Sequence, residues 1–444
     1  MVRRLPHSCL RRPCHLRRRP PPRSGWGLPR RRRPGGRVKT ATHTARPDKH
    51  DFDTLTGNTW SVHGGNHADE TTGAIRTPIV MANSYRLPED PSDIDDPGYR
   101  GLVYTREHGA NQRGLEEKLA KLDHGEAAAV FGTGMAALHA AFFTTLNPGD
   151  HAIVSNVVYM RVAGLFTDVF PKKLGIEVDF VDVTHLEQVH AAVRPTTKLV
   201  HTEVIANPDL RVADVSALAG IAHDAGAMLT VDSTFTPPPM MRPLDHGANL
   251  VMHSLTKYYN GHGDAMGGVI IGNRDLVEET RTGAMWHAGG AISPFNAWLI
   301  MRGSTTLPLR LQRQCENARA VAEFLDADPR VVHVSYPGLP SHDQHDAAVA
   351  QLSGGFGGVV SFAIGGTHTD RLSFVNNLRV ITSAVSLGHD ETLVAYEEYP
   401  EGPAEAFAQP FRDHGLVRLA IGLEAAEDLI ADLDASLTFA YRPR

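Results

Sequence analysis

The chain has 444 residues, of which 42% are hydrophobic and 21% charged, with 44 Lys and Arg against 50 Asp and Glu. This length is sufficient for two domains with cores of their own, and the composition is ordinary for a globular protein. The sequence contains no run of eighteen uncharged apolar residues, which argues against a membrane-spanning helix.

The charge is distributed unevenly along the chain. Residues 1–47 contain fifteen Arg and Lys and no Asp or Glu, so residues 48–444 have a net charge of −21. Clustered arginines could bind nucleic acid, and an Arg-rich, acid-poor leader could be a transit peptide, although serine is scarce here and prolines interrupt helices. We favour a disordered extension, for which a start codon placed too far upstream is one origin, and expect no nucleic-acid or membrane partner.

The cysteines indicate the compartment. Cys9 and Cys14 lie in the basic segment, which leaves Cys315 alone in the rest of the chain. An internal disulfide is therefore impossible in the folded part. This pattern is typical of a reducing compartment, and we expect a cytoplasmic protein.

Between residues 110 and 275, short apolar runs alternate with helix-like segments. The runs occupy residues 127–131, 151–155, 177–182, 198–204, 227–232, 249–254 and 267–272. In the intervening segments, residues such as Leu115, Leu119 and Leu122 repeat at helical spacing. The alternation predicts an α/β fold with a mostly parallel seven-stranded sheet, in which ligands bind at the carboxyl ends of the strands.

A smaller C-terminal α+β domain is expected after this sheet. Residues 294–325 predict one long helix with a kink at Leu307–Pro308. Further strands are expected at residues 331–335, 358–363 and 416–421. The predicted organisation is a disordered basic extension (1–50), an N-terminal arm (51–105), a large cofactor-binding domain (106–300) and a C-terminal domain (301–444).

Two neighbouring strand ends carry residues typical of a pyridoxal 5′-phosphate (PLP) site. Asp232 ends one apolar run, and Lys257 follows the next run, just after Ser254 and Thr256. PLP requires a lysine for its aldehyde, a carboxylate for its pyridine nitrogen and donors for its phosphate. A single lysine is usually a surface residue. The combination predicts that Lys257 binds PLP as a Schiff base and that Asp232 keeps the ring nitrogen protonated.

Gly132–Met135 follows the first apolar run and opens a helix. Glycine amides at a helix N-terminus bind anions, so this segment is a candidate phosphate site. With Ala137 it also satisfies the dinucleotide pattern G-x-G-x-x-A, which requires an acidic residue at the end of the next strand. That strand ends in Ser155 and Asn156. We therefore favour PLP over a nicotinamide cofactor.

The sequence resembles the Cys/Met-metabolism PLP enzymes, which have the aspartate-aminotransferase-like fold type I. This family includes methionine γ-lyase, cystathionine γ-lyase, cystathionine γ-synthase and O-acetylhomoserine sulfhydrylase. The resemblance extends from His63 to the C-terminal end. The matching motifs lie at 63–65 (HGG), 104–106 (YTR), 206–208 (ANP), 231–234 (VDST), 253–258 (HSLTKY), 293–295 (SPF), 384–388 (AVSLG) and 418–424 (RLAIGLE).

The resemblance implies roles for the matching residues. Tyr104 and Arg106 resemble the pair that binds the cofactor phosphate of a neighbouring subunit. This implies a homo-oligomer that is at least a dimer and, as is usual in the family, a tetramer. The expected cofactor contacts within the chain are Gly134, Met135, Ser254 and Thr256 to the phosphate, Asn207 to the 3-oxygen, Asp232 to the ring nitrogen and Tyr159 stacked on the ring. Tyr159 is also expected to move protons, and Ser386 with Arg418 to bind the substrate α-carboxylate.

Departures from the family are found around the expected substrate pocket. They are Gly109–Asn111 after the first motif, Met160–Arg161 beside the stacking tyrosine, Met285–Trp286, and Tyr396–Tyr399 in place of His-Pro-Ala-Ser. This pattern predicts an amino acid with an unusual γ-substituent, with neutral drift at the pocket rim as the alternative. Arg161 is a candidate for stabilising an anionic leaving group; alternatively it turns outward or pairs with an acid such as Glu397 or Glu398.

The function expected is a PLP-dependent lyase that carries out γ-elimination on a non-standard γ-substituted L-amino acid, with no metal. The alternative is γ-replacement of the cystathionine γ-synthase or O-acetylhomoserine sulfhydrylase type, which uses the same residues. A non-catalytic PLP-fold protein that binds nucleic acid through its basic segment is the competing class. The presence of Lys257, Asp232 and Arg418 favours an enzyme.

Overall fold

A computed structural model describes residues 55–95, 101–400 and 404–442. The predicted disordered extension at residues 1–50 lies outside the described residues. The larger of two sheets has seven strands, in the order β1-β7-β6-β5-β4-β2-β3. They are β1 Ala127–Phe131, β2 His151–Ser155, β3 Glu177–Val181, β4 Thr197–Glu203, β5 Met228–Asp232, β6 Leu250–His253 and β7 Gly268–Gly272.

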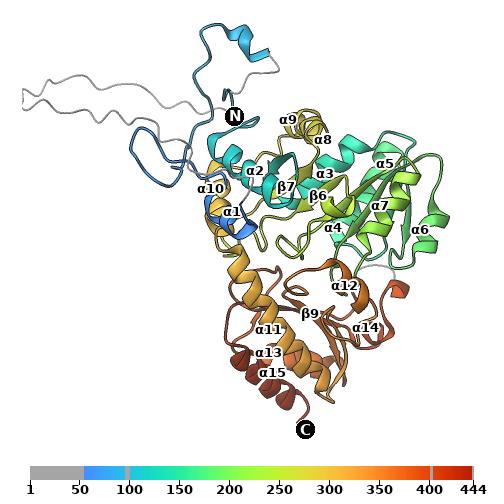
Figure 1. The fold of residues 1–444 in the computed structure, drawn as a ribbon. Coiled ribbons are helices and arrows are strands. Elements are labelled where there is room, and N and C mark those ends of the chain that lie inside the picture. Colours follow the sequence, from blue (N-terminus) through green and yellow to red (C-terminus); the bar gives the residue numbers. More distant parts are fainter. Residues whose placement is uncertain (1–54, 96–100, 401–403, 443–444) are drawn as a thin grey trace, which may run out of the picture. The chain divides into compact units, whose positions relative to one another are not determined.

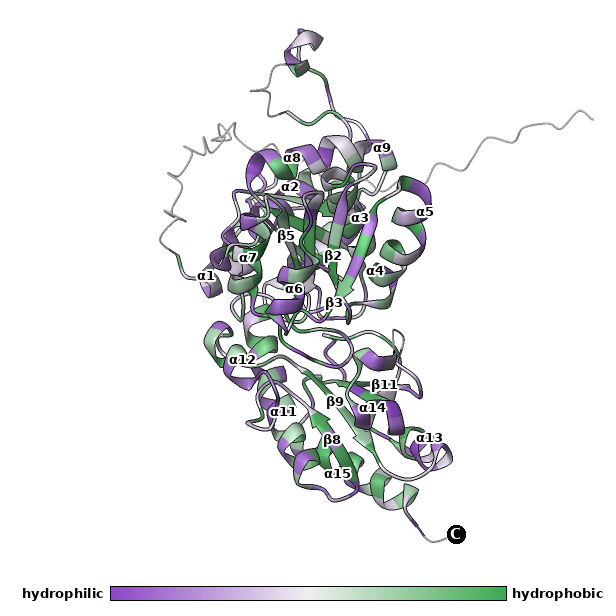
Figure 2. Cartoon of the chain, turned by 90° about the vertical axis from the view of Figure 1, so that its right-hand side faces the viewer, coloured by the Kyte–Doolittle hydropathy of each residue, from purple (hydrophilic) through white to green (hydrophobic). Residues whose placement is uncertain are grey.

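Strand β7 runs antiparallel to the other six strands, which are parallel to one another, so the predicted mostly parallel arrangement is confirmed. The helices of this region are α1 Gly57–His63, α2 Ala110–Leu122, α3 Gly134–Thr145, α4 Met160–Gly164, α5 Phe170–Leu174, α6 Leu186–Ala192, α7 Val215–Asp224, α8 Arg274–Thr280 and α9 Trp286–Ala288. Figure 1 and Figure 2 show helices on both sides of the strands.

Helices cover both faces of the sheet, which explains why the sequences of its strands are continuous apolar runs. In β1, Ala128 and Val130 pack into a cluster that contains Leu115 of α2, whereas Ala129 and Phe131 pack into a second cluster with residues of α3. Successive side chains of a strand point to opposite faces, and here both faces are apolar cores. The carboxyl ends of the strands are therefore left as the edge where polar residues can gather.

The second sheet has five strands in the order β10-β11-β12-β9-β8. They are β8 Val331–Ser335, β9 Val359–Ile364, β10 Thr382–Ser383, β11 Leu393–Glu397 and β12 Leu416–Ala420, and the helices are α12 His345–Gln351, α13 His368–Asn377, α14 Gln409–His414 and α15 Ala426–Ala440. The expected α+β arrangement is confirmed, and the sequence predicted β8, β9 and β12 but not β10 or β11. The predicted domain boundaries stay a prediction.

The single long helix expected at residues 294–325 is wrong. The structure has two helices, α10 Pro294–Ser304 and α11 Leu307–Ala327, separated at Thr305–Thr306. Pro308 lies in the first turn of α11. Proline lacks the N–H that would continue the ladder and its ring clashes with the carbonyl four residues earlier, so the break falls before the expected kink.

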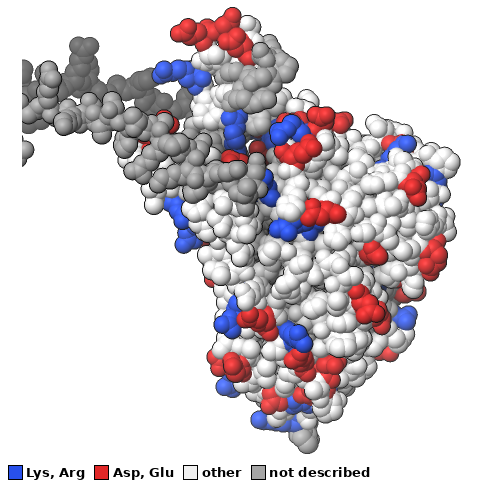
Figure 3. Space-filling view, in the orientation of Figure 1, with Lys and Arg blue, Asp and Glu red and all other residues white. Residues whose placement is uncertain are grey.

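The surface charge is mixed. On the face of the described residues in Figure 3, basic and acidic side chains are interspersed among neutral ones. Among the described residues, no helix has the length and apolar character that crossing a bilayer requires.

Candidate active site

Lys257 lies just after β6, in a loop that contacts the segment leading to β11. Its Nζ donates a hydrogen bond to Ser386 Oγ at 2.7 Å. Ser386 has a φ of 104°, a left-handed value that non-glycine residues rarely adopt and that is often found at functional sites. Burial, together with the charge of Arg418, lowers the pKa of Lys257 to about 8. The amine is therefore closer to a neutral base than an exposed lysine.

Asp232 ends β5 and is buried, with its Oδ1 accepting a hydrogen bond from the Thr234 backbone N–H at 2.8 Å. Burial raises the pKa of Asp232, and the hydrogen bonds from Thr234 partly oppose the shift. A buried carboxylate requires a compensating cation. The protonated pyridine nitrogen of PLP is such a cation, so this strand end fits the cofactor.

Glu203 at the end of β4 is a site residue that we did not expect from the sequence. It is buried and lies directly beside Asp232 in the strand register. Its two carboxylate oxygens accept hydrogen bonds from the backbone N–H groups of Tyr159 and Asn207, both at 2.7 Å. Burial, and then repulsion from Asp232, raise the pKa of Glu203. Glu203 thus joins the loops that carry two expected cofactor contacts.

Arg418, in the middle of β12, contacts Ser386 as expected and has one donor group, its Nε–H, without a described partner. Its guanidinium donates hydrogen bonds to Asn207 Oδ1 and, at 3.4 Å, to the backbone oxygen of Ser386. Its Nε is buried and has no hydrogen-bond partner among the described residues. An unsatisfied buried donor is costly, and a substrate carboxylate would satisfy it. The structure therefore brings Lys257, Ser386, Arg418, Asn207, Tyr159 and Asp232 together through this network and Glu203.

The residues expected at the phosphate lie at the start of α3 and after β6. Thr133 caps α3 by accepting a hydrogen bond from the Ala136 N–H at 3.0 Å, and Gly134 and Met135 form its first turn. A Cβ added to Gly134 would lie 3.0 Å from Ser254 Cβ, so a side chain at Gly134 would close the space beside the hydroxyl. Thr256 Oγ1 accepts a hydrogen bond from the Gly267 N–H. Helix amides and a hydroxyl beside a bare glycine fit a phosphate.

Tyr104 and Arg106 lie on the exposed arm, apart from this network. The Arg106 guanidinium lies 5.1 Å from the centre of the Tyr104 ring and 3.6 Å from the Glu107 carboxylate. Within the described part of this single chain, neither residue bonds to Lys257 or Arg418. Their role toward a partner's phosphate stays a prediction.

Tyr159 immediately precedes α4, and Arg161 lies in its first turn. Tyr159 is 38% exposed, and its charge contributes to the pKa of Arg418, which places the two side chains within electrostatic reach. Arg161 is exposed and forms no ion pair with any described residue, as in the outward-facing alternative. One of the acids considered for it, Glu398, pairs instead with His368 at 3.0 Å. The role of Arg161 toward an anionic leaving group also stays a prediction.

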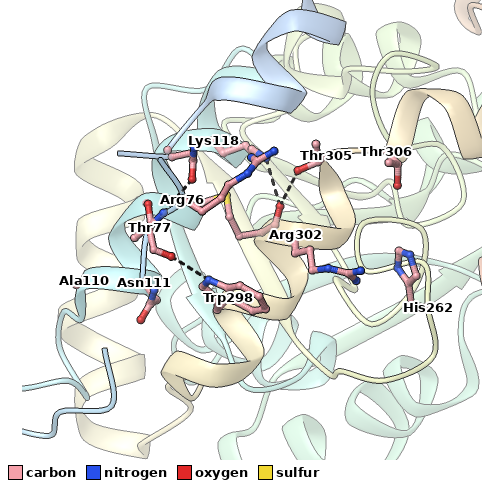
Figure 4. Close-up of a pocket in the computed structure, with 14 residues that line it drawn as sticks. Arg76, Thr77, Ala110, Asn111, Lys118, His262, Trp298, Arg302, Thr305 and Thr306 are labelled. Carbon is pink, nitrogen blue, oxygen red and sulfur yellow. Dashed lines mark hydrogen bonds between the residues drawn. The ribbon is translucent and has the colours of Figure 1, made fainter. Parts of the chain in front are cut away.

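A separate cavity of about 370 Å³ lies between the arm, α2 and α10. Figure 4 shows Arg76, Lys118 and Arg302 around it, with Trp298 Nε1 donating to the Thr77 backbone oxygen at 3.0 Å. Lys118 is 1% exposed, and burial together with the charge of Arg76 lowers its pKa to about 7. The residues that line this cavity include none of the expected cofactor or substrate residues.

Comparison with known proteins supports this assignment. The sequence pattern of the family described as Cys/Met metabolism PLP-dependent enzyme matches residues 58–438. A canavanine gamma-lyase from Rhizobium leguminosarum bv. trifolii is 55% identical over 89% of this chain and 99% of its own, and one from Pseudomonas canavaninivorans is 52% identical over 89% and 100%.

More distant relatives agree. An L-methionine gamma-lyase from Porphyromonas gingivalis is 38% identical over 85% of this chain and 96% of its own. The solved structure of cystathionine gamma synthase from Xanthomonas oryzae pv. oryzae, in complex with aminoacrylate and cysteine, has a TM-score of 0.81 and 36% identity over 87% of this chain and 98% of its own. The chain therefore belongs to the Cys/Met metabolism family of PLP-dependent enzymes, with fold type I and PLP as its cofactor, as the sequence predicted.

Proposed function

We propose that this enzyme cleaves the bond between Cγ and oxygen in canavanine or a closely similar γ-guanidinooxy amino acid. The observation that carries the proposal is the identity of 55% and 52%, over 89% of the chain, to two proteins named canavanine gamma-lyase. The coarser prediction, a PLP-dependent lyase that carries out γ-elimination on a γ-substituted amino acid, is confirmed. The rewritten pocket residues further support a substrate other than methionine.

Canavanine resembles arginine, with an oxygen in place of the methylene beside the guanidino group. Elimination breaks the Cγ–O bond, and the bonding electrons leave with oxygen as hydroxyguanidine. Of the two protons lost from Cα and Cβ, one is transferred to the leaving oxygen and the other is returned to the carbon chain. Water then hydrolyses the released enamine to 2-oxobutanoate and ammonia. When bound, PLP stabilises the negative charge that deprotonation leaves on the substrate.

In this proposal the chain's own residues hold the substrate and move these protons. Arg418 binds the α-carboxylate through its free Nε–H, with Ser386 beside it. Lys257, with a pKa near 8, is the base for the Cα proton. Tyr159, partly exposed and within reach of Arg418, gives a proton to the leaving oxygen. Asp232 keeps the ring nitrogen of the cofactor protonated.

The assembly and compartment are part of the proposal. A homo-oligomer, at least a dimer, would bring Tyr104 and Arg106 of one protomer to the phosphate in its partner. Both side chains are exposed on the arm and lie against each other, which leaves them accessible to a second chain. A cytoplasmic enzyme is consistent with Cys315 as the one cysteine outside the basic segment.

The test is a substrate panel with the purified, PLP-loaded enzyme. L-canavanine, O-acetylhomoserine and methionine are incubated separately, and hydroxyguanidine, ammonia, 2-oxobutanoate and homoserine are quantified by mass spectrometry. We expect hydroxyguanidine from canavanine at a kcat/KM well above that of the other substrates. Turnover of O-acetylhomoserine or methionine without release of hydroxyguanidine from canavanine would overturn the proposal.

The second candidate is γ-replacement. It is favoured by solved structures with 35–36% identity, namely metB from Corynebacterium glutamicum, with a TM-score of 0.79, and the Xanthomonas cystathionine gamma synthase. Adding cysteine or another thiol to the same assay distinguishes the two reactions. A thioether product in place of the keto acid would identify a transferase.

A further inference from the structure

The two acids in the rewritten segment Tyr396–Tyr399 point in opposite directions. Ala395 of β11 lies opposite Arg418 of β12, so these two side chains share one face of the small sheet. Glu397 lies two residues after Ala395 and therefore shares that face, since side chains alternate along a strand. Glu398 belongs to the other face, where its carboxylate pairs with His368 of α13.

The neighbouring residue Tyr396 confirms this alternation. Its hydroxyl accepts a hydrogen bond from Arg371 Nε of α13 at 3.0 Å, on the same side as the Glu398–His368 pair. The helix-covered face thus takes the even-numbered residues of the segment. The odd-numbered face is the one from which Arg418 reaches Asn207, which follows β4 of the large sheet.

Glu397 is half-buried and close to the substrate residues. Among the charged groups around Arg418, Glu397 contributes most to its pKa, followed by Tyr159, although burial of Arg418 has the larger effect and lowers that pKa. The carboxylate of Glu397 therefore lies on the face that carries the α-carboxylate site, within electrostatic reach of the Arg418 guanidinium.

The spacing on the strand matches the length of a guanidinooxy amino acid. Two residues of an antiparallel strand cover about 6.8 Å, which separates the levels of Ala395 and Glu397. Six bonds join the carboxylate carbon of canavanine to its guanidino carbon, and such an extended chain covers about 7 Å. A substrate with its carboxylate on Arg418 can therefore reach Glu397 with its other end.

We propose that Glu397 is the specificity-determining residue of this enzyme and that it binds the cationic guanidino end of the substrate. The inference rests on the proposed function and adds to it the group that recognises the substrate's charge. A carboxylate accepts two parallel N–H bonds from a guanidinium, and this charge-assisted pair favours a cationic γ-substituent over a neutral one of the same size. Glu397 occupies the position at which the family's His-Pro-Ala-Ser motif has proline, which has no charge.

The experiment compares two amino acids that differ in charge and not in length. L-Arginine has a guanidinium and L-citrulline a neutral urea at the same position, and neither has a leaving group at Cγ. Binding of each to the PLP-loaded enzyme is followed by the absorbance change of the bound cofactor. The ratio of the two dissociation constants reports recognition of the charge alone, since both ligands use Arg418 in the same way.

We expect the wild-type enzyme to bind arginine about 10- to 100-fold more tightly than citrulline, the usual range for a hydrogen bond to a charged group. Glu397→Gln should bring the two dissociation constants close to equality. Glu398→Gln, a matched change on the opposite face, should leave the preference intact. A preference retained in Glu397→Gln, or lost equally in both variants, would overturn the inference.

This test is separable from that of the proposed function. If canavanine is cleaved but Glu397→Gln retains the arginine preference, the function stands and the role of Glu397 is wrong. If canavanine is not cleaved but the wild-type preference disappears only in Glu397→Gln, the proposed reaction is wrong and Glu397 still recognises the cation. A wild-type enzyme that binds arginine and citrulline equally refutes the role of Glu397.

Discussion

Replacing Glu203 by glutamine tests whether this buried carboxylate positions the cofactor residues. Its two oxygens each accept one backbone N–H, from Tyr159 and from Asn207, at 2.7 Å. Glutamine keeps one acceptor and places an NH₂ group against the other N–H, so one charge-assisted bond of about 1.5–3 kcal/mol is lost. The same change removes the repulsion between Glu203 and Asp232, which offsets part of that loss in folding stability.

We therefore expect Glu203→Gln to impair catalysis more than stability. A displacement of Tyr159 or Asn207 by about 1 Å lowers the rate by about 10²-fold. The assay measures kcat, KM and the melting temperature, together with the absorbance spectrum of the bound cofactor, which reports the surroundings of its ring and 3-oxygen. Thr202→Val, an isosteric change at the preceding buried residue of β4, is the control. Wild-type kcat and spectrum in Glu203→Gln, or equal effects in both variants, would refute the reasoning.

Four further outcomes are expected. Lys257→Ala lowers kcat by at least about 10²–10⁴-fold and abolishes borohydride trapping of PLP on the chain, as mass spectrometry would show. After subunit exchange, an equal mixture of Lys257→Ala and Arg106→Ala recovers about a quarter of wild-type activity if sites are shared between protomers, because one site of each mixed dimer then has both wild-type groups. No recovery places the site within one chain. Arg161→Gly slows elimination of an anionic leaving group by about 10²–10³-fold and canavanine turnover far less, whereas equal losses give Arg161 a structural role. Burial lowers the pKa of Lys118 to about 7 in the folded protein, from an ordinary value of 10.5, so between these pH values the unfolded state binds more protons than the folded state. The stability of the wild type relative to Lys118→Met should therefore rise with pH, which melting temperatures at pH 7 and 9 would show.

The large sheet could be predicted from the sequence because its strands are buried on both faces. A strand such as β1, with Ala and Val throughout, contrasts clearly with the amphipathic helices around it. By contrast, β11 was not predicted because its residues serve different surroundings: Tyr396 contacts α13, whereas Glu397 faces the substrate residues. The apolar residues of β11 form only a short run that ends in charged residues, and which face each residue occupies becomes clear only from its pairing with β12.

Among the site residues, those with a family motif could be proposed from the sequence, and the network confirms their proximity. Glu203 was missed although it lies one residue before the end of a predicted strand, at the edge where ligands bind, and an acid within that apolar run was the available signal. Its function depends on the backbone N–H groups of Tyr159 and Asn207, which lie 44 and 4 residues away. Backbone N–H groups are common to nearly every residue, so the sequence does not show which of them a side chain such as Glu203 will bind.

The paired carboxyls of Glu203 and Asp232 have a consequence for the way the enzyme acquires its cofactor. Burial raises the pKa of both groups, and repulsion from Asp232 raises that of Glu203 further, so ionisation of the pair is favoured by a nearby cation. A protonated ring nitrogen beside Asp232 would be such a cation, so binding of PLP and ionisation of the acid pair favour each other. By linkage, the pH range in which these acids ionise is also a range in which the affinity for the cofactor depends on pH.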